Sequence, residues 1–232
     1  MAKDLENTMV GNNVYILTDI NAETTNGLIV QLTQWVNNMP FAKRDDLFYK
    51  EQKIQAKEAQ NKIYSPYDEI PDCIPTLNVW INSGGGKTFL MQSLLSMFHL
   101  ASACHGVIIK TYNLARACSS SSIIAISGTK GYRFMAEDAY NGIHFGSIKS
   151  EINHSSEIEF NKKYIDAWQN STLQIYLNNT KLANKELNKY YNTEGSGTLY
   201  SAQCLEKGLC DWVITNDGRF VNNVNELKQK QR

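Results

Sequence analysis

Short strand-like runs alternate with amphipathic helical segments along most of this chain, and this alternation restricts the folds open to it more than any other feature. Apolar, β-branched or aromatic runs stand at residues 14–17, 77–81, 107–112, 132–135 and 142–144. Helical spacing of apolar residues follows at about 24–39, 88–102, 119–127 and 158–177. Strands joined through helices form largely parallel sheets with right-handed crossovers. The sequence therefore predicts an α/β fold of stacked, repeated strand–helix units.

The stretch from about residue 41 to 74 differs in composition from its surroundings. It is rich in Lys, Glu, Asp and Gln, and Pro66, Pro71 and Pro75 interrupt its end. We interpret it as a solvated insertion in a single domain that spans residues 1–232, and not as a separate domain. The C-terminal residues, from about 218 to 232, are expected to form a polar tail.

Composition excludes several classes of protein. Lys+Arg and Asp+Glu balance at 23 each among 232 residues, so nothing indicates a nucleic-acid or anionic-membrane surface. No apolar run is long enough to cross a bilayer, and the N-terminal sequence MAKDLENTMVGNN lacks the apolar core of a signal peptide. We therefore expect a cytoplasmic or organelle-matrix protein. The five cysteines show no CxxC spacing, which favours reduced thiols over a zinc or disulfide framework, and no cofactor is expected.

A glycine-rich turn follows the strand at 77–81. Asn82-Ser83-Gly84-Gly85-Gly86-Lys87-Thr88 is similar to a phosphate-binding loop, but Ile81 stands where that motif requires its first glycine. A P-loop nucleotide-binding site is therefore disfavoured. Two interpretations remain open: a tight strand-to-helix turn, or a turn whose backbone N–H groups stabilise an oxyanion during acyl transfer.

A run of serines, Ser119 to Ser122, stands at a later strand-to-helix junction. Backbone amides and the helix dipole favour negative charge at such a position, although a serine run alone also fits a helix cap or polar loop. The isoleucines that follow predict a buried helix, which is a rigid platform for a nucleophile.

A histidine, His144, leaves the apolar strand at 142–144. A lone histidine there is also compatible with a structural role. His99, His105 and His154 have no comparable setting.

Taken in chain order, these features resemble the ClpP family of serine peptidases. His144 lies 25 residues after Ser119, which is the family's serine-to-histidine spacing. The resemblance covers about residues 14–215, and it rests on five segments: Ile81–Gly86, Ala115–Ser119, Ser127–Arg133, Gly142–His144 and Ser201–Asp211. The chain departs from the family pattern in three places: Gly84 replaces a proline, and Ser121 and Phe145-Gly146-Ser147 stand where flexible glycines are usual.

The resemblance implies a ClpP/crotonase-like fold with a protruding handle helix within about residues 147–180. It also implies a serine endopeptidase in which Ser119 is the nucleophile and His144 the general base. The backbone N–H groups of Gly86 and Ser120 would form the oxyanion hole.

The third member of the implied triad is Glu194. Counting forward from Thr180 reaches Glu194, whereas counting backward from Ser201 reaches Gly197. Glu194 is the only acid in the loop from 194 to 200, and a solvated loop glutamate remains the alternative.

The resemblance further implies a homo-oligomer of heptameric rings that encloses peptide or unfolded-protein substrates. An AAA+ unfoldase partner is left open, because the arm before Val14 is shorter than the family's usual axial loop. Three alternatives stay open: a catalytically inactive structural or regulatory ring subunit, a crotonase-type acyl-CoA enzyme, and a Ser–Lys peptidase with Lys110 or Lys130 as base.

Overall fold

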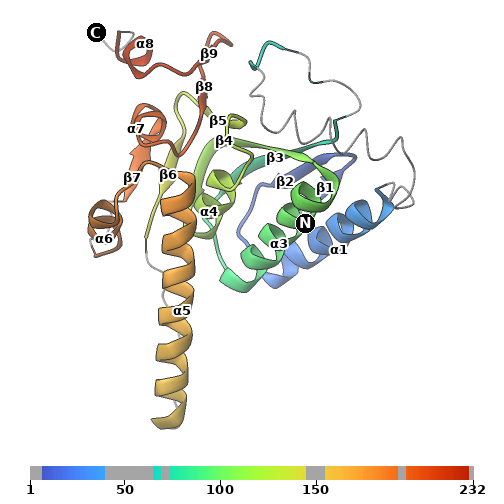
Figure 1. The fold of residues 1–232 in the computed structure, drawn as a ribbon, viewed down its shortest axis with the longest axis vertical. Coiled ribbons are helices and arrows are strands. Elements are labelled where there is room, and N and C mark those ends of the chain that lie inside the picture. Colours follow the sequence, from blue (N-terminus) through green and yellow to red (C-terminus); the bar gives the residue numbers. More distant parts are fainter. Residues whose placement is uncertain are drawn as a thin grey trace, which may run out of the picture.

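The computed structural model describes residues 7–39, 65–68, 70, 74–144, 155–192 and 197–229. A mostly parallel sheet forms its centre, with the strand order β1-β2-β3-β4-β5-β8-β9 and with β6 and β7 branching from β4 (Figure 1). Antiparallel pairs occur only at the margins among the described strands: β1 with β2, β6 with β7, and β8 with β9. The predicted α/β class with a parallel sheet is confirmed. The strands are β1 (Thr8–Val10), β2 (Asn13–Ile16), β3 (Thr76–Ser83), β4 (Ile108–Cys118), β5 (Arg133–Ala136), β6 (Tyr140–Gly142), β7 (Thr198–Tyr200), β8 (Trp212–Ile214) and β9 (Phe220–Val221).

Helices cover one face of the sheet, and one helix projects from it. In Figure 1, α1 and α3 run side by side, while α5 extends far beyond the rest of the domain as the predicted handle. The helices are α1 (Ala22–Asn38), α3 (Thr88–His105), α4 (Ser120–Ile126), α5 (Ser155–Asn179), α6 (Asn184–Asn192), α7 (Ser201–Glu206) and α8 (Val224–Gln229).

The core lies between the sheet and helices α1, α3 and α4. Strand β3 alternates strictly, with Leu77, Val79 and Ile81 fully buried. These residues belong to the same apolar cluster as Leu28 of α1 and Leu94 of α3. Every residue of α4 is buried, which confirms the prediction of a buried helix after the serine turn.

Strand β4 is longer than the sequence predicted. It continues past residue 112 to Cys118, pairing first with β5 as far as Asn113 and then with β6 from Arg116 onward. The second half escaped prediction because residues 114–116 are exposed and carry no apolar alternation. This extension brings the serine turn next to the histidine strand.

The start of α1 also differs from expectation. The N-cap is Asn21, whose side chain accepts from the Thr24 amide at 3.0 Å, while the Thr24 hydroxyl oxygen accepts from the Asn21 amide at 3.3 Å. Helix α1 therefore begins at Ala22, slightly before the helical spacing predicted, and Thr25 is buried.

The insertion at about 41–74 lies largely outside the described residues. Its described end packs on the sheet: Ile74 is buried, and the hydroxyl of Tyr67 accepts from the Phe220 amide at 2.9 Å. Among the described residues of this segment, Ile74 is therefore part of the packed interior, while Tyr67 remains exposed. The expected polar tail likewise contains the buried residues Val221 and Leu227.

Among the residues that the structure describes, none of the helices combines the length and apolar character needed to cross a membrane.

Candidate active site

The serine turn and the histidine follow two paired parallel strands. Cys118 of β4 is the register partner of Gly142 of β6. The next amide, that of Ser119, donates to the Gly142 carbonyl at 2.8 Å. His144 lies two residues beyond Gly142 and is exposed. The fold therefore brings Ser119 and His144 to the same edge of the sheet, because the carboxyl ends of parallel strands meet there.

The backbone of Ser119 is strained. Its φ of 54° and ψ of −126° make it the one non-glycine residue with positive φ in the described part of the chain. Such a conformation costs on the order of 1–3 kcal/mol and persists only where the surrounding structure imposes it. Ser119 is the N-cap of α4, yet its side chain makes no capping hydrogen bond. The turn thus presents the hydroxyl instead of using it to stabilise the helix.

The other three serines of the run are held by hydrogen bonds in the interior. Ser120 Oγ donates to the Gly86 carbonyl at 2.8 Å, and Ser121 Oγ to the Ser83 carbonyl at 2.8 Å. Ser122 Oγ donates to Asn141 Oδ1. Within the described residues, no hydrogen bond involves the half-buried hydroxyl of Ser119. This contrast identifies Ser119 as the available hydroxyl among the four.

The glycine turn lies directly against this serine. A Cβ added at Gly85 would stand 2.5 Å from the Cys118 carbonyl oxygen and 2.6 Å from Ser119 Cβ. One at Gly86 would stand 2.1 Å from the Ile20 carbonyl oxygen. Protein backbone therefore fills the space that phosphates would occupy in a nucleotide-binding loop. This packing argues against the P-loop alternative.

The N–H of Gly86 is directed toward the serine turn. Ile20 forms a parallel bridge opposite Gly86, donating to the Gly85 carbonyl at 2.7 Å and accepting from Lys87 at 2.6 Å. In such a bridge the intervening residue turns both its N–H and its C=O to the opposite side. The Gly86 carbonyl on that side accepts from Ser120 Oγ. The amide of Ser120, at the first position of α4, has no intrahelical acceptor. These two amides support the predicted oxyanion hole.

The lysines considered as alternative bases lie at the other end of the sheet. Lys110 precedes Ser119 by nine residues on β4, a separation of roughly 30 Å in an extended strand. Lys130 is next to Thr129, whose amide donates to the Ile109 carbonyl at 2.8 Å, again at the start of β4. Burial lowers the pKa of Lys110, but this strand position is out of reach of Ser119. The geometry excludes both lysines as the base for Ser119.

Cys118 precedes the proposed nucleophile but is a poor rival for it. Burial raises the pKa of its thiol, although the Arg116 guanidinium acts in the opposite direction. The thiolate is the reactive form of cysteine, so a raised pKa keeps Cys118 protonated near neutral pH.

Glu194 lies outside the described residues, so its role stays a prediction. The chain re-enters the described part at Gly197, whose carbonyl accepts from the Ile143 amide at 2.9 Å. A Cβ at Gly197 would stand 1.8 Å from the Ile143 carbonyl oxygen. The loop that carries Glu194 therefore ends in close contact with the residue before His144.

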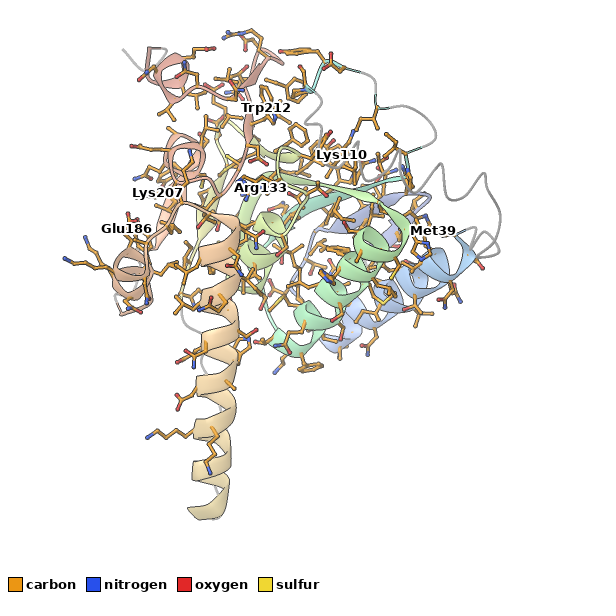
Figure 2. All side chains as sticks on the ribbon, viewed as in Figure 1. Met39, Lys110, Arg133, Glu186, Lys207 and Trp212 are labelled. Carbon is orange, nitrogen blue, oxygen red and sulfur yellow. The ribbon has the colours of Figure 1, made fainter. Side chains whose placement is uncertain are left out.

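The segments Ser127–Arg133 and Ser201–Asp211, which contribute to the family resemblance, are joined by an ion pair that stabilises the fold. Arg133 Nη2 lies 2.6 Å from Asp211 Oδ1, and Arg133 Nη1 donates to the Asn179 carbonyl at 2.5 Å, so the buried guanidinium ties β5 to the end of α5 (Figure 2). Sequence reasoning missed a second buried connection, which joins Ser122 to Asn141 and Tyr176. No periodicity or spacing marks these three residues as neighbours.

The parallel α/β fold, with a strained serine between a glycine turn and a histidine strand, places the chain in the ClpP/crotonase fold class. The family model described as Clp protease matches residues 52–217, and the chain belongs to the Clp protease family. The matched range contains the glycine turn, Ser119, His144 and the loop of Glu194.

Proposed function

We propose that this chain is a proteolytic subunit of the Clp type, a serine endopeptidase that hydrolyses peptides or unfolded proteins within a ring of identical subunits. The observation that carries the proposal is the strained backbone of Ser119, whose hydroxyl is available while the three serines after it are buried and hydrogen-bonded. Strain of this kind clusters at functional sites.

In the proposed reaction, Ser119 Oγ attacks the carbonyl carbon of the scissile peptide bond while the imidazole of His144 accepts the hydroxyl proton. The amides of Gly86 and Ser120 donate to the developing oxyanion. As the C–N bond breaks, the imidazolium returns the proton to the leaving amine. A water molecule then attacks the acyl-enzyme with His144 again accepting a proton, which releases the acid product and restores Ser119.

A second candidate is a ring subunit that does not cut. Its support is the altered serine turn, in which Ser121 stands where the family usually carries a flexible glycine. Family members assemble as rings, and both candidates retain that assembly.

A serine-directed fluorophosphonate separates the two candidates. In an active subunit the Ser119 oxygen displaces fluoride from the probe, so the protein gains the mass of the probe less HF and cleaves fluorogenic peptides; Ser119→Ala loses both properties. Ser127→Ala is the matched control, because the Ser127 hydroxyl donates only within α4, to the Ile123 carbonyl at 2.7 Å. A protein that assembles but neither labels nor cleaves would establish the inactive-subunit candidate instead.

A further inference from the structure

Three buried side chains join the nucleophile helix, the histidine strand and the handle helix. Ser122 of α4 is fully buried, and Asn141 of β6 and Tyr176 of α5 are each 2 % exposed. Ser122 Oγ donates to Asn141 Oδ1 and lies 2.7 Å from the Tyr176 hydroxyl. The three groups form a continuous hydrogen-bonded chain in the interior.

The direction of the hydrogen bonds among these three side chains follows from which groups can donate. A serine hydroxyl has one proton, and here that proton is given to an amide oxygen, which can only accept. The Tyr176 hydroxyl must therefore donate to Ser122 Oγ. The hydrogen bonds therefore run from the Tyr176 O–H to Ser122 Oγ, and from the Ser122 O–H to Asn141 Oδ1. Removal of the Tyr176 hydroxyl leaves Ser122 Oγ without the hydrogen bond that it accepts.

Two of these three hydrogen-bonded side chains lie close in sequence to the candidate catalytic residues. Ser122 lies one helical turn after Ser119, and Asn141 lies three residues before His144. The backbone pairing of β4 with β6 ends where the Ser119 amide donates to the Gly142 carbonyl. The hydroxyls of Ser120 and Ser121 hold the start of α4 on the other side, to the Gly86 and Ser83 carbonyls. The bond from Ser122 to Asn141 attaches α4 to β6, and Tyr176 fixes that point from α5.

We propose that Tyr176 and Asn141 are positioning residues: through Ser122 they fix the orientation of the nucleophile helix α4 relative to the strand that carries His144. This inference rests on the proposed peptidase function. A buried polar connection of this type gives a defined geometry, while each hydrogen bond in it contributes only about 0.5–1.5 kcal/mol net to folding. Its loss should therefore lower the catalytic rate more than stability.

The test is Tyr176→Phe, which removes one hydroxyl and keeps the ring. We expect kcat to fall about 10- to 100-fold with KM changed by less than about twofold, because misplacement of a reacting group by about 1 Å costs on the order of 10²-fold. The rate of fluorophosphonate labelling at Ser119 should fall in parallel. The thermal midpoint should stay within about 4 °C of wild type.

A double-variant comparison shows whether the effect passes through Ser122. Ser122→Ala should resemble Tyr176→Phe, and the double variant should be no slower than the slower single variant, since both remove the same connection. Asn141→Val removes the acceptor at the other end of the hydrogen-bonded series and should give the same loss of kcat. It is the replacement test if Tyr176→Phe fails to fold. Ser127→Ala, at the C-cap of the same helix, should keep the wild-type kcat.

Different failures have different meanings. If wild type labels and cleaves while Tyr176→Phe and Asn141→Val label at the wild-type rate, the positioning role is overturned and the proposed function stands. If the two single losses multiply in the double variant, Tyr176 does not act through Ser122, which also overturns the proposal. A wild-type protein that neither labels nor cleaves overturns the proposed function, and the positioning role with it.

Discussion

The amide of Ser119 donates a 2.8 Å hydrogen bond to the carbonyl of Gly142. Parallel pairing between β4 and β6 therefore continues up to the residue proposed as nucleophile, and His144 follows the end of β6, two residues after Gly142. The Ser119 amide is occupied by this bond, which is consistent with the amides of Gly86 and Ser120 as the proposed oxyanion donors. This one backbone hydrogen bond thus holds Ser119 beside the strand that leads to His144, and it also limits which amides are available to an oxyanion.

Replacement of the histidine tests the base directly. We expect His144→Ala to lose about 10⁴-fold in kcat with fold and assembly intact, as when the base of a serine triad is removed. The measurement is peptide turnover, with sedimentation to check assembly. His99→Ala, on α3 away from the turn, is the matched control and should keep wild-type turnover. Wild-type turnover in His144→Ala would remove His144 from the mechanism.

The strain at Ser119 predicts a difference in stability between two variants that both lack the hydroxyl. Glycine adopts positive φ without a Cβ clash, whereas alanine retains the clash. Ser119→Gly should therefore be more stable than Ser119→Ala by about 1–2 kcal/mol. Thermal unfolding of the two variants at equal protein concentration measures this, with a rise of about 2–4 °C per kcal/mol for a chain of this size. Both variants should be inactive, and equal midpoints would show that the turn stores no strain.

Gly142 offers a test of the close approach between the two strands. A Cβ there would stand 2.7 Å from Cys118 Sγ and 3.1 Å from Cys118 Cβ. Gly142→Ala should therefore spread β4 from β6, costing about 1–3 kcal/mol and lowering kcat. Adding Cys118→Ala removes the sulfur atom from this contact and should restore most of the lost stability and most of the lost kcat. If the double variant is no better than Gly142→Ala alone, crowding at Cys118 is not the cause.

Because the charged insertion is predicted to be solvated, we expect most of it to be dispensable for the core. Replacing residues 41–64 with a glycine–serine linker of about 12 residues should leave the thermal midpoint within about 4 °C of wild type. A longer replacement that also removes Ile74 should be destabilised by at least about 1.5–3 kcal/mol, because this side chain is buried. The measurement is the thermal midpoint of each of the two variants. Collapse of the shorter one would show that residues 41–64 pack on the core or form an interface.

Hydrophobic periodicity in the sequence predicted the parallel sheet, the long helix at about 158–177 and the buried helix after the serine turn. That the long helix projects as a handle was implied by the resemblance to the ClpP family. It did not predict the conformation of Ser119, because positive φ is signalled by glycine and not by serine. Nor could it assign a partner to each serine of the run: the acceptors of Ser120 and Ser122 are Gly86 and Asn141, which are brought near by tertiary contacts.

The last prediction concerns Glu194. A carboxylate that accepts from the imidazole holds it in its productive tautomer and stabilises the imidazolium, and loss of that charge in a serine triad lowers kcat by about 10⁴-fold. We expect Glu194→Gln to show a large loss of kcat, because its loop joins β7 where the Gly197 carbonyl binds the Ile143 amide, one residue before His144.

The matched control is Glu186→Gln on the preceding helix. Glu186 lies 2.5 Å from Lys207 Nζ in a partly exposed ion pair (Figure 2), and the hydrogen bond from Lys207 lowers the pKa of its carboxyl group. Such a pair contributes at most about 1 kcal/mol to stability, so this variant should keep wild-type turnover. The measurement is peptide hydrolysis by wild type and both variants without nucleotide. Undiminished turnover in Glu194→Gln would mean that His144 is oriented by another carboxylate, or that Ser119 and His144 act as a dyad.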